Sequence, residues 1–191
     1  MSTSTLRVAI LDDYQRVALT VADWSSIQDQ LSIDVFTDTI SSEDALAQRL
    51  EPYTIICAMR ERTKFSASLL DRLPNLKLIA TTGMRNAAID ITHAKYKGII
   101  VSGATGKGNS TLEHIWALIL ATARYLVTED RNMKEGKTQW QSTLPMGLSG
   151  RTLGLIGVGG LGSHTAAVSN SFIMAGNSDE ACIIRLPRHL V

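Results

Sequence analysis

The chain has 191 residues, of which 45% are hydrophobic, and a formal net charge of +1. This length suits one large domain or a domain with part of another, and the composition is sufficient for a buried core. Because charges of both signs are interspersed, the sequence offers no electrostatic case for nucleic acid or membrane-surface partners.

Five short apolar runs with helix-like segments between them occupy the first hundred residues. The predicted strands are Leu6–Leu11, Ser32–Phe36, Thr54–Ala58, Lys77–Thr81 and Ile99–Ser102. The first predicted helix follows a capping box formed by Ser41 and Asp44 and ends at about Leu50. The second is Ser66–Leu73, which is stopped by Pro74, and the third is Ala87–Lys97, which is capped by Gly98. This alternation predicts a doubly wound, parallel, flavodoxin-like α/β domain.

A glycine-rich linker, Gly103–Asn109, precedes a helix predicted from Ser110 to Arg124, with an extension toward Lys134. Its apolar face has a period near 3.6 and consists of Leu112, Ile115, Trp116, Ile119, Leu120 and Ala123. We expect this helix to cross from one domain to the next, and its apolar stripe is compatible with a homodimer. Gly136–Gly150 is polar and is predicted to be a surface segment.

A glycine motif follows that segment. Thr152–Ile156 is predicted to be a buried strand, and Gly160–Phe172 a helix. Gly157, Gly159 and Gly162 between them have the spacing of a dinucleotide-binding turn. There the first glycine allows a tight turn, the second admits a pyrophosphate and the third lets the helix pack closely.

We therefore expect NAD or NADP to be the cofactor, held by Gly157, Gly159, Gly160, Leu161 and Gly162. An acidic residue about 20 positions on would bind the ribose hydroxyls. Asp179 and Glu180 lie near that distance, but Ala175–Ser178 before them has loop composition, so we interpret this acidic pair as incidental. The sequence leaves the choice between NAD and NADP open.

Two other nucleotide or phosphate motifs fail. Gly103–Gly108 lacks the first glycine of a P-loop and has Gly108 where Ser or Thr is required. Asp12 and Asp13 follow the first strand as in a phosphoreceiver domain, but the third strand ends in Cys57–Met59 without an acceptor aspartate. No metal-ligand pattern is present, so we expect no metal site.

Several motifs in fixed order resemble the D-isomer-specific 2-hydroxyacid dehydrogenase family, which includes phosphoglycerate dehydrogenase and glyoxylate/hydroxypyruvate reductases. They are Leu73–Ile79, Thr82–Asp90, Gly98–Val101, Asn109–His114, Gly136–Trp140 and Leu148–Thr152. The resemblance implies a substrate-type α/β domain at 1–103 that lacks its C-terminal return segment. It further implies the start of a dinucleotide-binding, incomplete Rossmann domain at 104–174 and an unmatched tail at 175–191.

The family exchanges a hydride between a nicotinamide cofactor and a small 2-hydroxy or 2-keto acid. By resemblance, backbone N–H groups of Thr82, Gly83 and Met84 would hold the substrate carboxylate, and Arg60 would lie beside it with paired donors. Glu61 departs from the small polar residue usual after that arginine, and Met84 from the usual small or aliphatic one.

The family's catalytic Arg, Glu and His belong to segments downstream of the matched motifs, so we expect no catalytic residue here. His93, His114, His164 and His189 are interpreted as structural or solvated, because the predicted fold gives none of them a carboxylate partner.

We therefore expect a truncated, inactive relative of an NAD(P)-dependent oxidoreductase acting on CH–OH groups. The alternatives are an active oxidoreductase and a non-catalytic dinucleotide-binding or dimerisation module. The match ends at Phe172–Met174, which suggests a shifted reading frame or a retained intron. Absence of family-like coding sequence downstream would refute that hypothesis.

The chain's location is predicted from three features. The longest apolar stretch, Ile115–Ala121, is too short for a membrane span, and Met1–Leu6 lacks a signal-peptide core. Cys57 and Cys182 are typical of free thiols in a reducing compartment. We expect a cytoplasmic protein.

Overall fold

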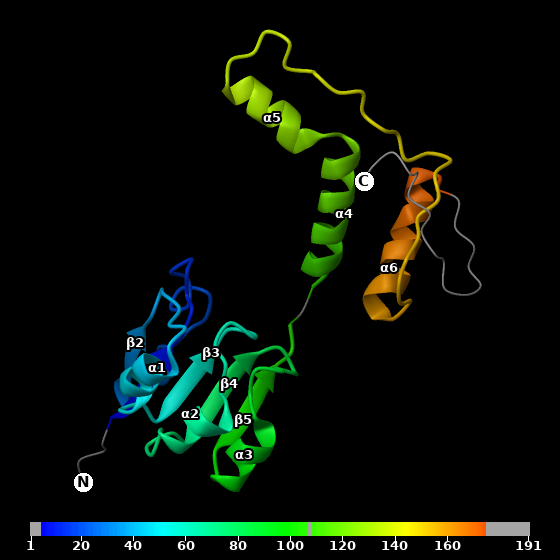
Figure 1. The fold of residues 1–191 in the computed structure, drawn as a ribbon. Coiled ribbons are helices and arrows are strands. Elements are labelled where there is room, and N and C mark those ends of the chain that lie inside the picture. The colour runs from blue at the N-terminus through cyan, green and yellow to red at the C-terminus, as the bar shows by residue number, and fades with distance from the viewer. Residues whose placement is uncertain (1–4, 107, 175–191) are drawn as a thin grey trace. The chain divides into compact units, whose positions relative to one another are not determined.

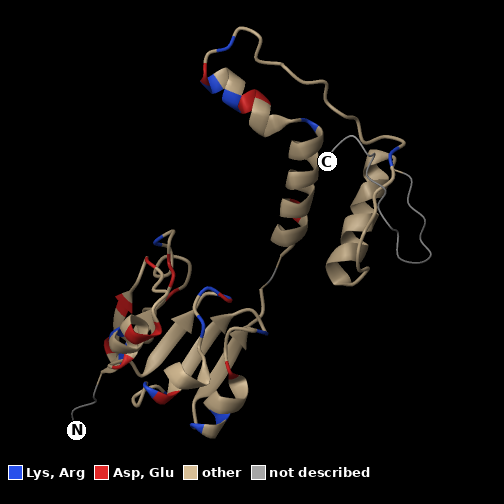
Figure 2. Ribbon diagram, in the orientation of Figure 1, with Lys and Arg blue, Asp and Glu red and all other residues tan. Residues whose placement is uncertain are grey.

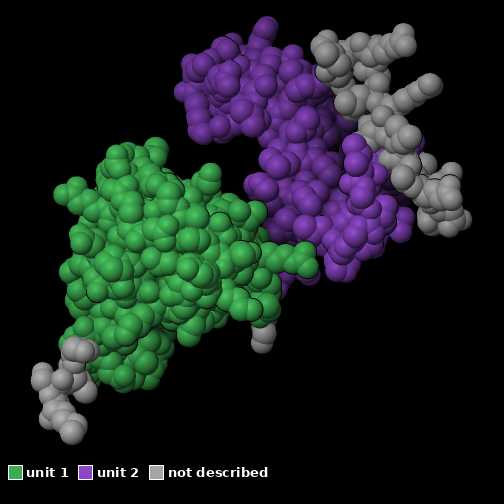
Figure 3. All heavy atoms as spheres, turned by 60° about the horizontal axis from the view of Figure 1, so that its bottom comes forward, with its two compact units in different colours: residues 1–107 green, residues 108–191 purple. Residues whose placement is uncertain are grey.

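The computed structural model describes residues 5–106 and 108–174. The chain divides into two compact units, 1–107 and 108–191 (Figure 3). This division falls inside the Gly103–Asn109 segment, where glycines leave the backbone few side chains to pack.

Unit 1 contains a five-stranded parallel sheet (Figure 1). Its strands are β1 (Leu6–Ile10), β2 (Leu31–Val35), β3 (Ile55–Ala58), β4 (Leu78–Thr82) and β5 (Ile100–Ala104), in the order β2-β1-β3-β4-β5. The predicted α/β class and parallel sheet are confirmed. The order in which strands are added to the sheet reverses between β1 and β3, since β2 lies on one side of this point and β4 and β5 on the other. In such sheets, ligands bind beyond the carboxyl ends of the strands at that point.

The helical elements of unit 1 are η1 (Gln28–Gln30), α1 (Glu43–Leu50), α2 (Ala67–Asp71) and α3 (Ile91–Tyr96). The predicted Ser41/Asp44 capping box is wrong. Ser42 is the N-cap residue, and its hydroxyl accepts a hydrogen bond from the Ala45 N–H at 3.5 Å. The cap therefore lies one residue later than expected.

The start of α3 also differs from the prediction, which began that helix at Ala87. Asp90 caps the helix, because its carboxylate accepts from the His93 N–H at 2.9 Å. Ile89 instead forms a bridge with Phe65, whose N–H donates to the Ala88 carbonyl at 2.7 Å. This tertiary pairing keeps the segment before Asp90 out of the helix.

The two faces of the sheet differ in burial. Alternate strand residues, including Ala9, Ile56 and Ile79, have no exposed surface and belong to the apolar core that also contains side chains of α1, α2 and α3. The opposite face carries the intervening residues, because successive side chains alternate across a strand. On that face Ile55, Cys57, Leu78 and Ala80 are paired in register and only partly buried.

Unit 2 contains α4 (Ser110–Ala123), α5 (Leu126–Lys134), α6 (Gly160–Ser169) and the short η2 (Asn170–Phe172). The predicted extension of α4 toward Lys134 forms a separate helix, because Tyr125 has a left-handed φ of 52° that interrupts the helix. The predicted apolar face of α4 is confirmed. Trp116 and Ala123 on it are buried, and the Trp116 ring stacks on Phe172 with centroids 4.9 Å apart.

The buried strand predicted at Thr152–Ile156 is wrong. The structure shows a single bridge residue, Thr152, but no strand over this range, and Ile156 is 97% exposed. An extended segment becomes a strand only when a neighbour takes its backbone hydrogen bonds. In the described part of unit 2 no other strand is present to do so. No described helix has both the length and the apolar character that a membrane span requires.

Candidate functional site

The first candidate site lies on the loops that follow β3 and β4. Arg60 comes two residues after β3 and has a left-handed φ of 51°, an uncommon conformation for a residue with a side chain. Two side chains hold its backbone, Thr82 at the end of β4 and Asn86 in the loop that follows. The Arg60 N–H donates to the Thr82 hydroxyl at 3.1 Å, and its carbonyl accepts from the Asn86 amide at 2.6 Å.

Gly83 lies against the Arg60 side chain. A Cβ atom built on Gly83 would be 1.9 Å from Arg60 Nη1, and Gly83 has a φ of +91°. Gly103 on β5 is restricted by space, because a Cβ there would lie 2.6 Å from the Gly83 carbonyl oxygen, whereas Gly83 is restricted by its positive φ. Glycine is favoured at both positions, and the Arg60 guanidinium lies against bare backbone at Gly83.

The backbone donors of this loop differ in availability. The Gly83 N–H donates to the Ala104 carbonyl at 3.0 Å and is therefore already engaged. Among the described residues no acceptor takes the N–H groups of Met84 and Arg85. The Met84 side chain is 66% exposed, so the loop is open to solvent. Arg60, Thr82, Gly83 and Met84, the four predicted substrate residues, thus come together in one place.

Asn86 belongs to this site and was missed as a site residue at the level of sequence. Its side chain is buried and forms three hydrogen bonds, donating to the Arg60 carbonyl and to the Thr81 hydroxyl at 2.9 Å and accepting from the Ala88 N–H at 2.9 Å. A polar side chain in the loop after a strand was the only signal for it. That signal does not reveal a partner 26 residues away.

The second candidate site is the glycine turn of unit 2. Gly157 has a φ of +87°, and Gly159 is the N-cap residue of α6. A Cβ on Gly162 would lie 2.2 Å from the Gly157 carbonyl oxygen, so the helix can approach the turn only with glycine at that position. These are the backbone requirements of a dinucleotide-binding turn.

The space around this turn also fits a phosphate group. A Cβ built on Gly159 or Gly160 meets no atom within 4 Å, so the backbone is open there. The first turn of α6 contains no acidic residue that would compete with a bound anion. The free N–H groups at a helix N-terminus, including those of Leu161 and Gly162, are a suitable site for a pyrophosphate.

The three histidines in the described part of the chain lie in neither candidate site. His93 has a carboxylate partner, contrary to the prediction, because its Nε2 is 2.9 Å from Asp71 Oδ1. Hydrogen bonds from His93 and Lys97 lower the pKa of the Asp71 carboxyl below its usual value. This cluster joins α2 to α3. His114 and His164 are exposed, and His189 lies outside the described residues, as do Asp179 and Glu180.

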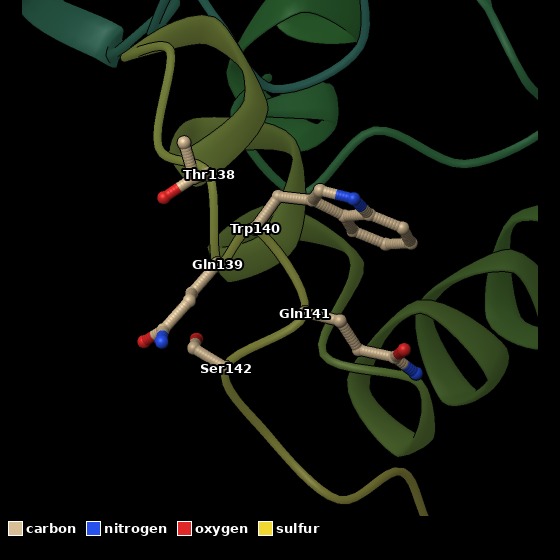
Figure 4. Close-up of a pocket in the computed structure, with 5 residues that line it drawn as sticks. All are labelled: Thr138, Gln139, Trp140, Gln141 and Ser142. Carbon is tan, nitrogen blue, oxygen red and sulfur yellow. The ribbon is translucent and has the colours of Figure 1, made fainter.

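A surface pocket in unit 2 is lined by five consecutive residues, Thr138, Gln139, Trp140, Gln141 and Ser142. In Figure 4 the side chains of Trp140 and Gln141 project to one side of the segment and that of Gln139 to the other. The pocket therefore does not gather functional groups from several elements. In the described part of the chain no group of three His, Cys, Asp or Glu side chains is arranged to bind a metal.

Glu129 on α5 fixes this segment. Its carboxylate accepts hydrogen bonds from the Thr143 hydroxyl and from the N–H groups of Ser142 and Thr143, the latter at 2.8 Å. These bonds, first that of the Thr143 hydroxyl and then that of the Ser142 N–H, lower the pKa of Glu129 from its ordinary value of 4.5 to about 2. Asn132 also donates to the Trp140 carbonyl at 3.1 Å. The cluster accounts for the conformation of the segment without a ligand.

Comparison with known proteins gives consistent results. Residues 8–181 match the family described as D-isomer specific 2-hydroxyacid dehydrogenase, catalytic domain. A D-3-phosphoglycerate dehydrogenase of Archaeoglobus fulgidus is 38% identical over 136 residues, covering 70% of this chain and 25% of that protein. A hydroxypyruvate reductase of Thermotoga maritima is 32% identical over 143 residues, covering 74% of this chain and 46% of that protein.

Comparison with a solved structure indicates the same family. The crystal structure of a phosphoglycerate oxidoreductase from Vibrio cholerae superimposes with a TM-score of 0.81 at 36% identity, covering 88% of this chain and 54% of that one. The chain therefore spans between a quarter and about half of the length of these relatives.

Proposed function

The chain belongs to the D-isomer specific 2-hydroxyacid dehydrogenase family, and on this premise we propose that it retains two binding functions of such an enzyme. Unit 1 binds the carboxylate of a small 2-hydroxy or 2-keto acid. Unit 2 binds the pyrophosphate of NAD or NADP. The chain by itself does not catalyse the reaction.

The observation that carries the proposal is the placement of the Arg60 guanidinium against Gly83, in the loop that also contains the unengaged N–H groups of Met84 and Arg85. A carboxylate accepts well from both kinds of donor, and a planar guanidinium can offer it two parallel hydrogen bonds. Met84 is exposed, so a small acid can reach the loop from solvent. In this proposal Thr82 and Asn86 hold the loop through the Arg60 backbone.

The cofactor function is supported by the conformation of Gly157 and by the close approach of Gly162. The N–H groups at the start of α6 would hold the pyrophosphate. When bound, a nicotinamide cofactor supplies or accepts the hydride. The chain's own residues would only bind and orient it.

We propose that the chain lacks turnover because hydride transfer also requires a group that accepts or donates a proton. A 2-hydroxy acid loses its hydroxyl proton to a general base within hydrogen-bond reach. His93 is the one histidine of unit 1, and its Nε2 is paired with the Asp71 carboxylate on α2. The described residues thus offer the carboxylate a binding site without a histidine base beside it.

The test for the acid site is calorimetric titration of the full chain with glyoxylate and with hydroxypyruvate. Arg60→Ala and Arg60→Lys are expected to weaken binding by roughly tenfold or more, since lysine cannot offer the paired donors. Arg72→Ala is the matched control, because Arg72 is paired with Asp44 on the surface. Equal losses in all three variants would contradict the proposal.

The test for the cofactor site is titration with reduced and oxidised NAD and NADP. Gly162→Ala should abolish binding, because the added Cβ collides with the Gly157 carbonyl. Gly147→Ala, where a Cβ meets no neighbour, is the control and should bind as the parent chain does. Sustained oxidation or reduction of either acid by the purified chain would disprove the proposed lack of turnover.

A dimerisation module is the second candidate. Among Asp, Glu, Lys and Arg, α4 contains only Glu113, and Figure 2 shows that helix almost without charge. Leu118 on α4 is 55% exposed and Val127 on α5 is 69% exposed. Sedimentation of the parent chain and of Leu118→Lys would identify such a module if the lysine variant alone is monomeric.

The cytoplasm is the proposed location. Cys57 is a free thiol in the described part of the chain, as expected in a reducing compartment. Cell fractionation with an antibody to the chain tests this location.

A further inference from the structure

Asp12 follows β1 at the carboxyl edge of the sheet and is a second unusual residue there. Its side chain is only 1% exposed, and its φ of 58° is left-handed. A buried carboxylate in a strained backbone conformation persists only where its surroundings stabilise both features. The groups that contact Asp12 should therefore explain why it is buried in this conformation.

Those partners come from the loops after β2 and β3. The Thr39 hydroxyl donates to Asp12 Oδ1, and the Thr63 hydroxyl donates to Asp12 Oδ2 at 2.7 Å. The Arg62 guanidinium donates to the Asp12 carbonyl at 2.7 Å. One residue thus joins the ends of three neighbouring strands.

The loop that Asp12 holds from one side is the loop that carries Arg60. Arg62 is further stabilised because its guanidinium stacks on the Tyr14 ring, 4.3 Å from the centroid. From the other side, Thr82 and Asn86 bind the Arg60 backbone. Arg60 lies between these two anchors.

We propose that Asp12 is a positioning residue for Arg60. Its carboxylate, through Thr63, and its carbonyl, through Arg62, fix the loop after β3 so that the Arg60 guanidinium stays against Gly83. Asp12 itself touches no substrate. The substrate part of this inference depends on the proposed acid-binding function, whereas the effect on the loop does not.

Asp13 provides a matched control. It is also buried, at 5% exposed, and its carboxylate is also fully engaged. Its partners, however, are the N–H groups of Val17 and Ala18 at 3.1 and 3.0 Å, within its own loop. Replacing Asp13 removes a buried carboxylate of the same kind without releasing the Arg60 loop.

The first measurement is amide hydrogen exchange of the full chain without ligand. Asp12→Ala should raise the exchange rate of the Arg60 and Arg62 amides by roughly tenfold. Asp13→Ala should raise exchange at Val17 and Ala18 and leave the Arg60 amide unchanged. A purely structural role for Asp12 would instead raise exchange throughout β1, as its loss of stability would be shared by the whole unit.

The second measurement is titration with glyoxylate. Asp12→Ala should weaken binding by roughly tenfold, a loss typical of removing a residue that orients a binding group. Asp13→Ala should bind as the parent chain does. If the parent chain binds no glyoxylate, the proposed acid function fails, and the exchange pattern still decides whether Asp12 holds the loop.

A second pair of variants tests the proposal independently if Asp12→Ala does not fold. Thr63→Val removes the hydroxyl with little change of shape, and Thr63→Ser retains it. Thr63→Val should reproduce the loop exchange and the affinity loss, and Thr63→Ser should restore both. Folded Asp12→Ala or Thr63→Val chains with parent-like Arg60 exchange would overturn the proposal.

Discussion

The candidate sites of the two units are held in place in different ways. In unit 1 the Arg60 loop is placed by tertiary contacts above an apolar core whose members Phe65, Leu69 and Ile79 have no exposed surface. In unit 2 the glycine turn takes its shape from local backbone conformations. The residues leading into that turn include Ile156, which is 97% exposed.

The comparison indicates that the Arg60 loop depends on a packed core, whereas the glycine turn does not. The proposed phosphate-binding turn depends on local backbone alone, because Gly157 acts through its own φ and Gly162 through a neighbour five residues away. The guanidinium site requires partners more than 20 residues apart in the chain. We therefore expect mutations in the two units to have effects of different size.

Phe65→Ala is expected to have the largest effect. Phe65 is fully buried in the core of unit 1, so its truncation should lower the free energy of unfolding by about 3–5 kcal/mol. Leu144→Ala in unit 2, at a side chain 91% exposed, should change it by less than about 0.5 kcal/mol. Urea denaturation followed by circular dichroism measures both. Similar losses of unfolding free energy in the two variants would contradict the expected difference between the units.

Asn86→Ala is expected to have the next largest effect. It leaves the Arg60 carbonyl and the Thr81 hydroxyl without their donor in a buried place, which costs about 1–3 kcal/mol. Asn75→Ala, which removes an exposed bond to the Glu51 carbonyl, is the control and should cost less. The free energies of unfolding are again compared by urea denaturation, and a larger loss for Asn75→Ala would contradict this ranking.

Gly98→Ala tests a purely conformational effect in unit 1. Gly98 has a φ of +75° and open space around it, so an added Cβ costs about 1 kcal/mol through the backbone alone. Gly147→Ala in unit 2, without a positive φ, should cost less than about 0.5 kcal/mol. Thermal unfolding should show the lower melting temperature for Gly98→Ala, and the reverse order would be inconsistent with the backbone argument.

Glu129 is expected to have the smallest effect, confined to one segment of unit 2. Its pKa in the folded chain, about 2, is below the ordinary 4.5 of a glutamate. The stabilisation of the Thr138–Ser142 segment is therefore complete above pH 4.5 and is lost as the pH falls toward 2. Fluorescence of Trp140, half exposed in that segment, should change over this range, and the change should be absent in Glu129→Gln.

The sequence predicts the fold of unit 1 well because its signals are local. Five apolar runs of strand length give the five parallel strands. The start of α3 was misplaced because the pairing of Phe65 with Ile89 joins distant residues and competes with helix formation. The strand at Thr152–Ile156 failed for a related reason, since a strand needs a neighbour that an apolar pattern cannot reveal.

For the candidate sites, the glycine turn and the Arg60 loop could be named from motifs and from family resemblance. The supporting residues could not. Asn86 and Asp12 act through partners 26 and 51 residues away, and a short polar side chain in a turn is usually an ordinary turn residue. Only a structure shows which carbonyl or hydroxyl such a side chain reaches.

The less buried face of the unit 1 sheet carries a built-in chemical probe. Cys57 lies near the middle of that face among Ile55, Leu78 and Ala80, and burial raises the pKa of its thiol. In a Cys182→Ser chain, the rate at which an alkylating reagent modifies Cys57 therefore reports on the cover of that face. Anything that docks there, whether another protein or a hydrophobic dye, should slow the modification.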